Sequence, residues 1–149
     1  MKKQKLTKWT KYLLDFMFYC GILVTVSLPF TIRWIGNYVV RVKESYGELV
    51  MIYFVLGIAA LVIVRELRKI FGTVLKENCF VRENVVSLRK MGNWSFFIVL
   101  MSVVRSVVYL TVALLVVILV FIIAGLFSKV LACVFEEAIN YKEENELTI

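Results

Sequence analysis

The sequence has no histidine, one proline and only three cysteines among its 149 residues. Without histidine, zinc sites with imidazole ligands cannot form, and three thiols do not complete a closed four-ligand site. Cys20, Cys79 and Cys133 show no paired spacing, so we expect three reduced thiols that pack as small apolar side chains. The sequence therefore predicts no bound metal ion and no other cofactor.

Recognisable catalytic arrangements are lacking as well. The chain has no glycine-rich phosphate loop, no serine with a basic partner at a useful spacing and no paired carboxylates within its apolar runs. Activated nucleophiles and general bases need identifiable partner groups. We therefore predict that the protein is not an enzyme.

Apolar residues are abundant instead. They make up 61% of the chain, and its mean hydropathy is +0.85, whereas a soluble domain is nearer to half apolar. A short domain leaves a large share of its surface exposed, so it could not hide this many Leu, Val, Ile and Phe side chains in one core. The composition excludes a soluble globular protein and predicts a membrane protein.

The net charge of +7 comes largely from two clusters of cations. Five lysines lie between Lys2 and Lys11, and seven Lys or Arg residues lie between Arg65 and Lys90. Both clusters adjoin long apolar runs, which is the distribution that the positive-inside rule describes for the cytoplasmic flanks of membrane spans. We therefore expect them to orient the protein in a membrane and not to bind nucleic acid directly.

The first two apolar runs each suit one membrane span of about 20 residues. The first ends at Ile32 and is expected to be retained rather than cleaved as a signal peptide, because Asp15 interrupts it and no small-residue cleavage site follows. The second lies before Arg65 and continues as an amphipathic helix. A break is expected at residues 76–79, followed by a short amphipathic helix that ends at Gly92 and Asn93.

The region after Gly92 allows two interpretations. Residues 94–128 contain one charge, Arg105, and no Pro, Asn or Asp to mark a turn. Residues 91–135 are long enough for two crossings at ~1.5 Å per residue, with a very short outer turn. Alternatively, residues 106–128 form one span and residues 91–104 lie on the membrane. Spacing favours two spans without excluding one.

Two stretches carry a resemblance to a known family. The first runs from Phe80 to Gly92 and reads FVRENVVSLRKMG, and the second is the tail that ends in KEENELTI. Together they resemble the YoaS-like family of small bacterial integral membrane proteins, a domain of unknown function. That family has a central F-x-x-E-N-x-x-x-L-R-x-[IM]-G segment and a terminus close to E-N-D-L-T-I. Glu146 stands where the family more often has Asp, which keeps the charge.

The resemblance implies four spans with both termini in the cytoplasm, and hence a multi-pass protein of the bacterial inner membrane. The expected fold is all-α, a polytopic bundle of transmembrane helices with amphipathic cytoplasmic helices. It forms one domain over residues 1–149, with spans at 12–32, 47–66, 92–112 and 114–135, a cytoplasmic helical segment at 67–91 and a cytoplasmic acidic tail at 136–149.

Two charges within the apolar runs are candidate functional residues. A cation at membrane depth is costly and is usually paired or turned towards water, so we expect a structural partner for Arg105, such as Asp15, or snorkelling to the outer interface. Transport through Arg105 is the alternative. For Asp15 we expect a local ion pair with Lys8 or Lys11 on the same helix.

A partner-binding surface is predicted where the basic central segment meets the acidic tail. Opposite charges favour docking of these two elements, although the basic stretch could equally lie on anionic lipid beside a solvated tail. The apolar C-terminal end could be captured by a pocket in this protein or in a partner. The residues predicted for this surface are Glu83, Asn84, Leu88, Arg89, Glu143, Glu144, Leu147, Thr148 and Ile149.

Genes of the YoaS-like family often neighbour a gene for a very small helix-turn-helix regulator. This resemblance favours a membrane-resident regulator that binds a small cytosolic protein, such as a helix-turn-helix transcriptional regulator. The alternatives are an immunity or stress protein that acts against membrane-active peptides, and a small transporter or channel subunit. The expected partners are the lipid bilayer, that regulator and a second copy of the chain in a homo-oligomer.

Overall fold

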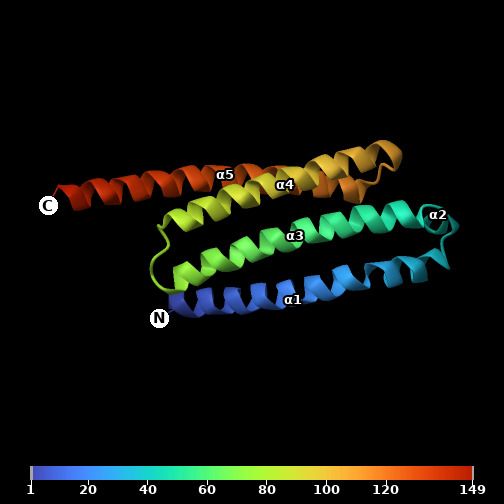
Figure 1. Ribbon diagram of the computed structural model, residues 1–149, viewed down its shortest axis with the longest axis horizontal. Helices are drawn as coiled ribbons and strands as arrows, with labels where there is room; N and C mark the ends of the chain where they lie inside the picture. Colours follow the sequence, from blue (N-terminus) through green and yellow to red (C-terminus); the bar gives the residue numbers. More distant parts are fainter. Residues whose placement is uncertain (1, 149) are drawn as a thin grey trace.

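The computed structural model describes residues 2–148, and these form five helices (Figure 1). The helices are α1 (Lys2–Gly36), α2 (Val40–Glu44), α3 (Tyr46–Leu75), α4 (Arg82–Val108) and α5 (Val112–Leu147). The described residues include no strand, so the all-α prediction is confirmed. Four of the helices, all except α2, are long and apolar enough to cross a membrane. The protein is a multi-pass membrane protein.

The region that allowed two interpretations holds two long helices. α4 runs to Val108 and α5 begins at Val112, so only residues 109–111 connect them. Thr111 caps α5 by accepting a hydrogen bond from the backbone N–H of Leu114 at 3.3 Å. α4 also passes through Gly92 and Asn93 without a break, so the prediction that a short helix ends there was wrong.

Gly92 serves helix packing and does not end α4. A side chain at Gly92 would meet the backbone carbonyl of Gly125 on α5 at 3.3 Å, so glycine lets α4 and α5 approach closely. Membrane helices use small residues in this way because lipid gives them no hydrophobic drive to associate. The same device joins α1 to α3, where a side chain at Gly57 would lie 2.9 Å from the hydroxyl of Thr25.

The helices pack in chain order. α1 packs on α3, α3 on α4 and α4 on α5, and within residues 2–148 α1 makes no backbone approach to α4 or α5. Both chain termini and the connection between α3 and α4 lie at one end of the molecule, called the terminal end below. The opposite end, called the α2 end, holds α2 and the connection between α4 and α5 (Figure 1).

The hairpin formed by α1 and α3 extends further towards the α2 end than the hairpin formed by α4 and α5. Figure 1 shows the α4–α5 connection stopping short of α2 along the long axis of the molecule. Thr111 in that connection shares a cavity with Thr25 and Leu28 of α1, whereas α1 continues to Gly36. Val107, Leu110 and Val112 are largely exposed, as suits side chains that face hydrocarbon. The α4–α5 hairpin therefore turns at a depth where α1 is still apolar.

The main apolar cluster lies towards the terminal end. Its buried members come from α3, α4 and α5, and they are Ile70, Val85, Leu88, Met91, Ala132 and Ile139. The helices expose most of their apolar side chains elsewhere, and at most 28% of the residues are buried in the apolar 18-residue stretch that marks each long helix as a candidate span. The cluster therefore fixes the terminal end of the three helices, and the rest of the surface is suited to lipid.

Candidate functional site

The terminal end joins α4 to α5 by opposite charges. Arg89 of α4 pairs with Glu136 of α5 at 2.5 Å, and Arg82 pairs with Glu143 at 2.9 Å. The four side chains are between 38% and 60% exposed, so each pair contributes little alone. The pairs follow one line because seven residues separate both the cations and the anions, which is about two helical turns.

Apolar contacts lie beneath these ion pairs. Ile139 is 5% exposed and belongs to the same cluster as Val85 and Leu88. Beside it, the rings of Phe80 and Phe135 lie 5.2 Å apart between centroids. This part of α5 is therefore held against α4 mainly by burial, and the ion pairs fix its alignment.

Asn84 holds the connection between α3 and α4 in place. Its side chain is 1% exposed and donates hydrogen bonds to the hydroxyl of Thr73 and to the backbone carbonyl of Cys79, each at 2.6 Å. Within this connection Glu77 adopts a positive φ of 57°, the left-handed conformation that reverses the chain. Asn84 thus acts as an internal clamp and does not face a partner.

The predicted partner-binding residues therefore fall into three groups. Asn84 and Leu88 are buried and support the surface from inside. Arg89 and Glu143 are exposed, and each forms an ion pair between α4 and α5, with Glu136 and Arg82 respectively. The third group is exposed without an ion pair among the described residues, and it consists of Glu83, Glu144, Leu147 and Thr148. Ile149 lies outside the described residues.

The end of α5 projects beyond every other described element at the terminal end (Figure 1). Leu147 is 87% exposed, and the hydroxyl of Thr148 bonds to the backbone carbonyl of Glu144 at 2.6 Å. The side chain of Leu147 thus has no pocket in this chain. The projecting segment carries Glu144 and Glu146, which form no ion pair among the described residues, and is available to another molecule.

A protein-family model covers most of the chain, including α4 and the tail. A family model described as a protein of unknown function (DUF2975) matches residues 9–149. The chain belongs to this family. The match covers the α4 segment and the tail that carry the sequence resemblance, and it confirms the prediction of a domain of unknown function. No curated protein and no solved structure is significantly similar to the chain.

Asp15 does not form the predicted local pair in this member of the family. It pairs instead with Arg68 of α3 at 2.5 Å, and the guanidinium of Arg68 lies 4.6 Å from the ring centroid of Phe18. The prediction failed because it considered only neighbours on the same helix, whereas packing of α1 on α3 brings a distant arginine closer. Asp15 and Arg68 therefore tie α1 to α3.

Arg105 has an aromatic partner rather than an acidic one. Its guanidinium lies 4.6 Å from the ring centroid of Tyr53 on α3, and among residues 2–148 no carboxylate pairs with it. Arg105 lines a cavity of about 470 Å³ that all four long helices border. The proposed pairing with Asp15 was wrong, because Asp15 lies towards the terminal end and is paired there with Arg68.

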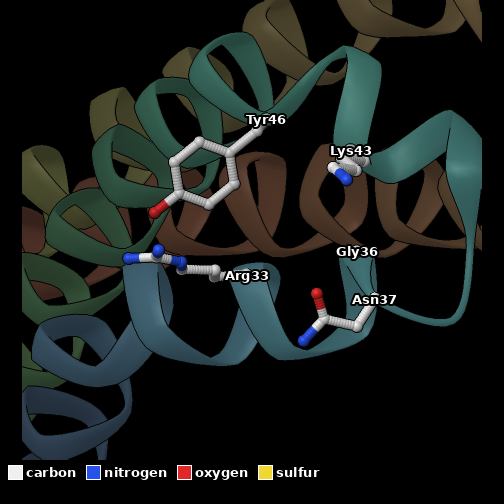
Figure 2. A pocket seen from close by; sticks show the side chains of 5 residues that line it. All are labelled: Arg33, Gly36, Asn37, Lys43 and Tyr46. Carbon is white, nitrogen blue, oxygen red and sulfur yellow. The ribbon is translucent and has the colours of Figure 1, made fainter.

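A second cavity of about 480 Å³ opens at the α2 end. Figure 2 shows Arg33, Asn37, Lys43 and Tyr46 around it. The hydroxyl of Tyr46 donates to the backbone carbonyl of Pro29 at 3.0 Å, which fastens the start of α3 to α1. The cavity presents two cations, and its walls are the end of α1, the short helix α2 and the start of α3.

Three polar residues at helix interfaces escaped the sequence analysis. Glu66 on α3 is 5% exposed and bonds to Lys69 at 3.0 Å, Arg68 binds Asp15, and Ser102 on α4 is completely buried. A serine in an apolar run, or one charged residue among several cations, gives no distinctive sequence pattern, so only the packing of the helices reveals these roles. Among the described residues, no three His, Cys, Asp or Glu side chains gather closely enough to hold a metal ion.

Proposed function

We propose that this protein is a non-enzymatic, membrane-resident regulator whose terminal end faces the bacterial cytoplasm and binds a small cytosolic protein. The observation that carries the proposal is the acidic end of α5. It projects from a firmly packed base, and the side chains of the projecting end are exposed. A segment that only ended a membrane span would not need a base of buried apolar side chains and aligned ion pairs.

Charge distribution supports the proposed orientation. The lysines at the start of α1 and the cations from Arg65 to Lys90 all belong to the terminal half of the helices, and cations favour the cytoplasmic side of inner-membrane proteins. The opposite end carries both positive and negative residues between Arg33 and Glu48. The cytoplasmic face would then hold both termini.

The chemistry of α5 indicates the kind of partner. Glu144 and Glu146 present negative charge on an exposed helix, so they complement a basic protein surface. Helix-turn-helix regulators carry a basic surface because they bind DNA phosphates. A regulator held by α5 would have that surface covered, so membrane binding and DNA binding would exclude each other.

Site-specific photo-crosslinking tests this proposal. A crosslinking amino acid at position 144 should capture a small cytosolic protein in living cells, whereas the same amino acid at Lys43, at the α2 end, should not. Replacing Glu144 and Glu146 with glutamine should reduce the captured fraction at least about tenfold if the charges provide the recognition.

A matched variant separates recognition from folding. Tyr141 is 70% exposed on the same helix, so Tyr141→Ala should leave both membrane insertion and capture unchanged. Equal capture at positions 144 and 43, or capture that persists after neutralisation of the glutamates, would contradict the proposal.

A further inference from the structure

The cavity that holds Arg105 lies among the four long helices, at the depth of residues 24–28 of α1. Its walls are mostly aliphatic and aromatic side chains, with Arg105, Ser102 and Thr111 among the few polar ones. An apolar cavity of 300–1,000 Å³ with a few polar groups that fix orientation is typical of a ligand site. The volume of about 470 Å³ lies within this range.

The side chains of Ser102 and Arg105 in this cavity have no hydrogen-bond partner among the described residues. Ser102 is completely buried, and its hydroxyl oxygen has no hydrogen-bond partner among the described residues. Arg105 contacts the face of the Tyr53 ring, which leaves the N–H groups at the edge of the guanidinium available. A buried hydroxyl without a partner costs free energy, and so does a cation at membrane depth. A bound acceptor would compensate both.

The surroundings favour a negative acceptor. None of the described side chains that line the cavity is acidic. Ala113 and Leu114 in the first turn of α5 also line it, and although Thr111 caps the N–H of Leu114, the dipole of α5 gives its N-terminus partial positive charge. Arg105 and the start of α5 thus attract an anion, while Leu28, Leu56 and Val117 offer an apolar wall beside it.

We infer that this cavity binds an amphiphile with an anionic head group, a phosphate or a carboxylate. The head group lies on Arg105 and accepts a hydrogen bond from Ser102, and one acyl chain follows the apolar wall between the hairpins. Because the α4–α5 hairpin stops short of the α2 end, the site is open to one leaflet of the bilayer. This site is separate from the proposed partner-binding surface, because it lies at the other end of α4.

Two matched pairs of ligands test the inference on the full chain in a neutral maltoside detergent. Decanoate and decanol have the same chain but differ in charge, and dihexanoyl phosphatidylglycerol and phosphatidylcholine differ in head-group charge. A ligand that binds the folded protein raises its unfolding temperature. We expect the anionic member of at least one pair to bind about tenfold more tightly than its neutral or zwitterionic counterpart. A preference for decanoate identifies a free acid, and one for the glycerol lipid identifies a membrane lipid.

Variants of the cavity connect this preference to its residues. Arg105→Gln should abolish the preference for the anion, whereas Arg105→Lys, which keeps the charge, should retain part of it. Ser102→Ala should weaken anion binding about threefold without lowering the unfolding temperature of the free protein, because it removes a hydroxyl that has no partner. Ser95 supplies the control, since its buried hydroxyl bonds to the backbone of Met91 and lies outside the cavity. Ser95→Ala should leave anion binding unchanged.

Two results would overturn the inference. The first is equal binding of the charged and uncharged members of both pairs, and the second is a preference for the anion that survives Arg105→Gln. An effect of Ser95→Ala equal to that of Ser102→Ala would also count against it, because it would indicate a general loss of helix packing.

Discussion

Asn84 lies where α3, α4 and their connection meet, and one side chain serves all three. The amide donates to Thr73 on α3 and to the backbone of Cys79 in the connection, while its own backbone belongs to the first turn of α4. A buried polar group is stable only when its hydrogen bonds are satisfied, and both donors here are used. The tight connection at residues 76–81 therefore depends on this residue more than on any charge near it.

Replacement of Asn84 should show this dependence. Asn84→Ala removes both hydrogen bonds and leaves the carbonyl of Cys79 without this donor, so we expect a loss of about 1–3 kcal/mol in the free energy of unfolding. The fluorescence-detected unfolding temperature in detergent would report the loss. Asn145 is exposed, and Asn145→Ala should have no effect. A loss of similar size in both variants would show that the clamp has no special role.

At the scale of the element, the terminal part of α5 is held by two kinds of contact. Exposed ion pairs contribute up to about 1 kcal/mol each, whereas truncation of a buried isoleucine costs about 2–5 kcal/mol. Glu143 is 53% exposed in its pair, and Ile139 is 5% exposed among Val85 and Leu88. The magnitudes indicate that apolar burial holds the helix and that the charges set its alignment.

Two truncations on α5 distinguish these contributions. Ile139→Ala should reduce the hydrogen-exchange protection of residues 82–88 strongly, because the packed base of α4 would open. Glu143→Ala should reduce it only slightly. If the second variant had the larger effect, the ion pairs would dominate and the assignment to apolar burial would be wrong.

At the scale of the whole molecule, four long helices in chain order bring both ends of the chain to one side. Cysteine variants in a background without Cys20, Cys79 and Cys133 test the proposed orientation. A membrane-impermeant maleimide applied to intact cells should label position 40, in α2, and should leave positions 2 and 145 unlabelled. Lysed cells should be labelled at all three positions, which controls for reactivity. Labelling of position 145 in intact cells would contradict the proposed cytoplasmic end.

Much of this fold follows from the sequence because run length and charge placement are local properties. The first two spans and the break after Leu75 could be predicted, since a membrane sets the length of a helix and cations mark its flank. For the region after Gly92, spacing only favours two spans, and the count of four comes from the family resemblance. The α4–α5 connection could not be predicted. Tyr109 and Thr111 adopt extended conformations with φ of −139° and −125°, which any residue accepts, so no Gly, Pro or Asn marks the turn.

The candidate sites were predicted less completely, because they depend on which helices become neighbours. The meeting of the basic segment and the acidic tail could be expected from charge, and Arg82 indeed pairs with Glu143. The partners of Asp15 and Arg105 could not be expected, since both lie on α3, far away in the sequence. Ser102 is one of several serines, and only its burial beside a cavity distinguishes it.

The unequal reach of the two hairpins has a consequence for the surrounding lipid. α1 is apolar as far as Ile32, while the α4–α5 hairpin turns beside Thr25 and Leu28, about four residues or roughly 6 Å short of that point at the helical rise. Lipids on one flank of the protein therefore meet a shorter hydrophobic length than lipids on the other. Each ångström of such mismatch costs a fraction of a kcal/mol, which the bilayer reduces by thinning or the helices by tilting. The tilt of the α4–α5 hairpin against α1 and α3 is thus coupled to the thickness of the membrane around it.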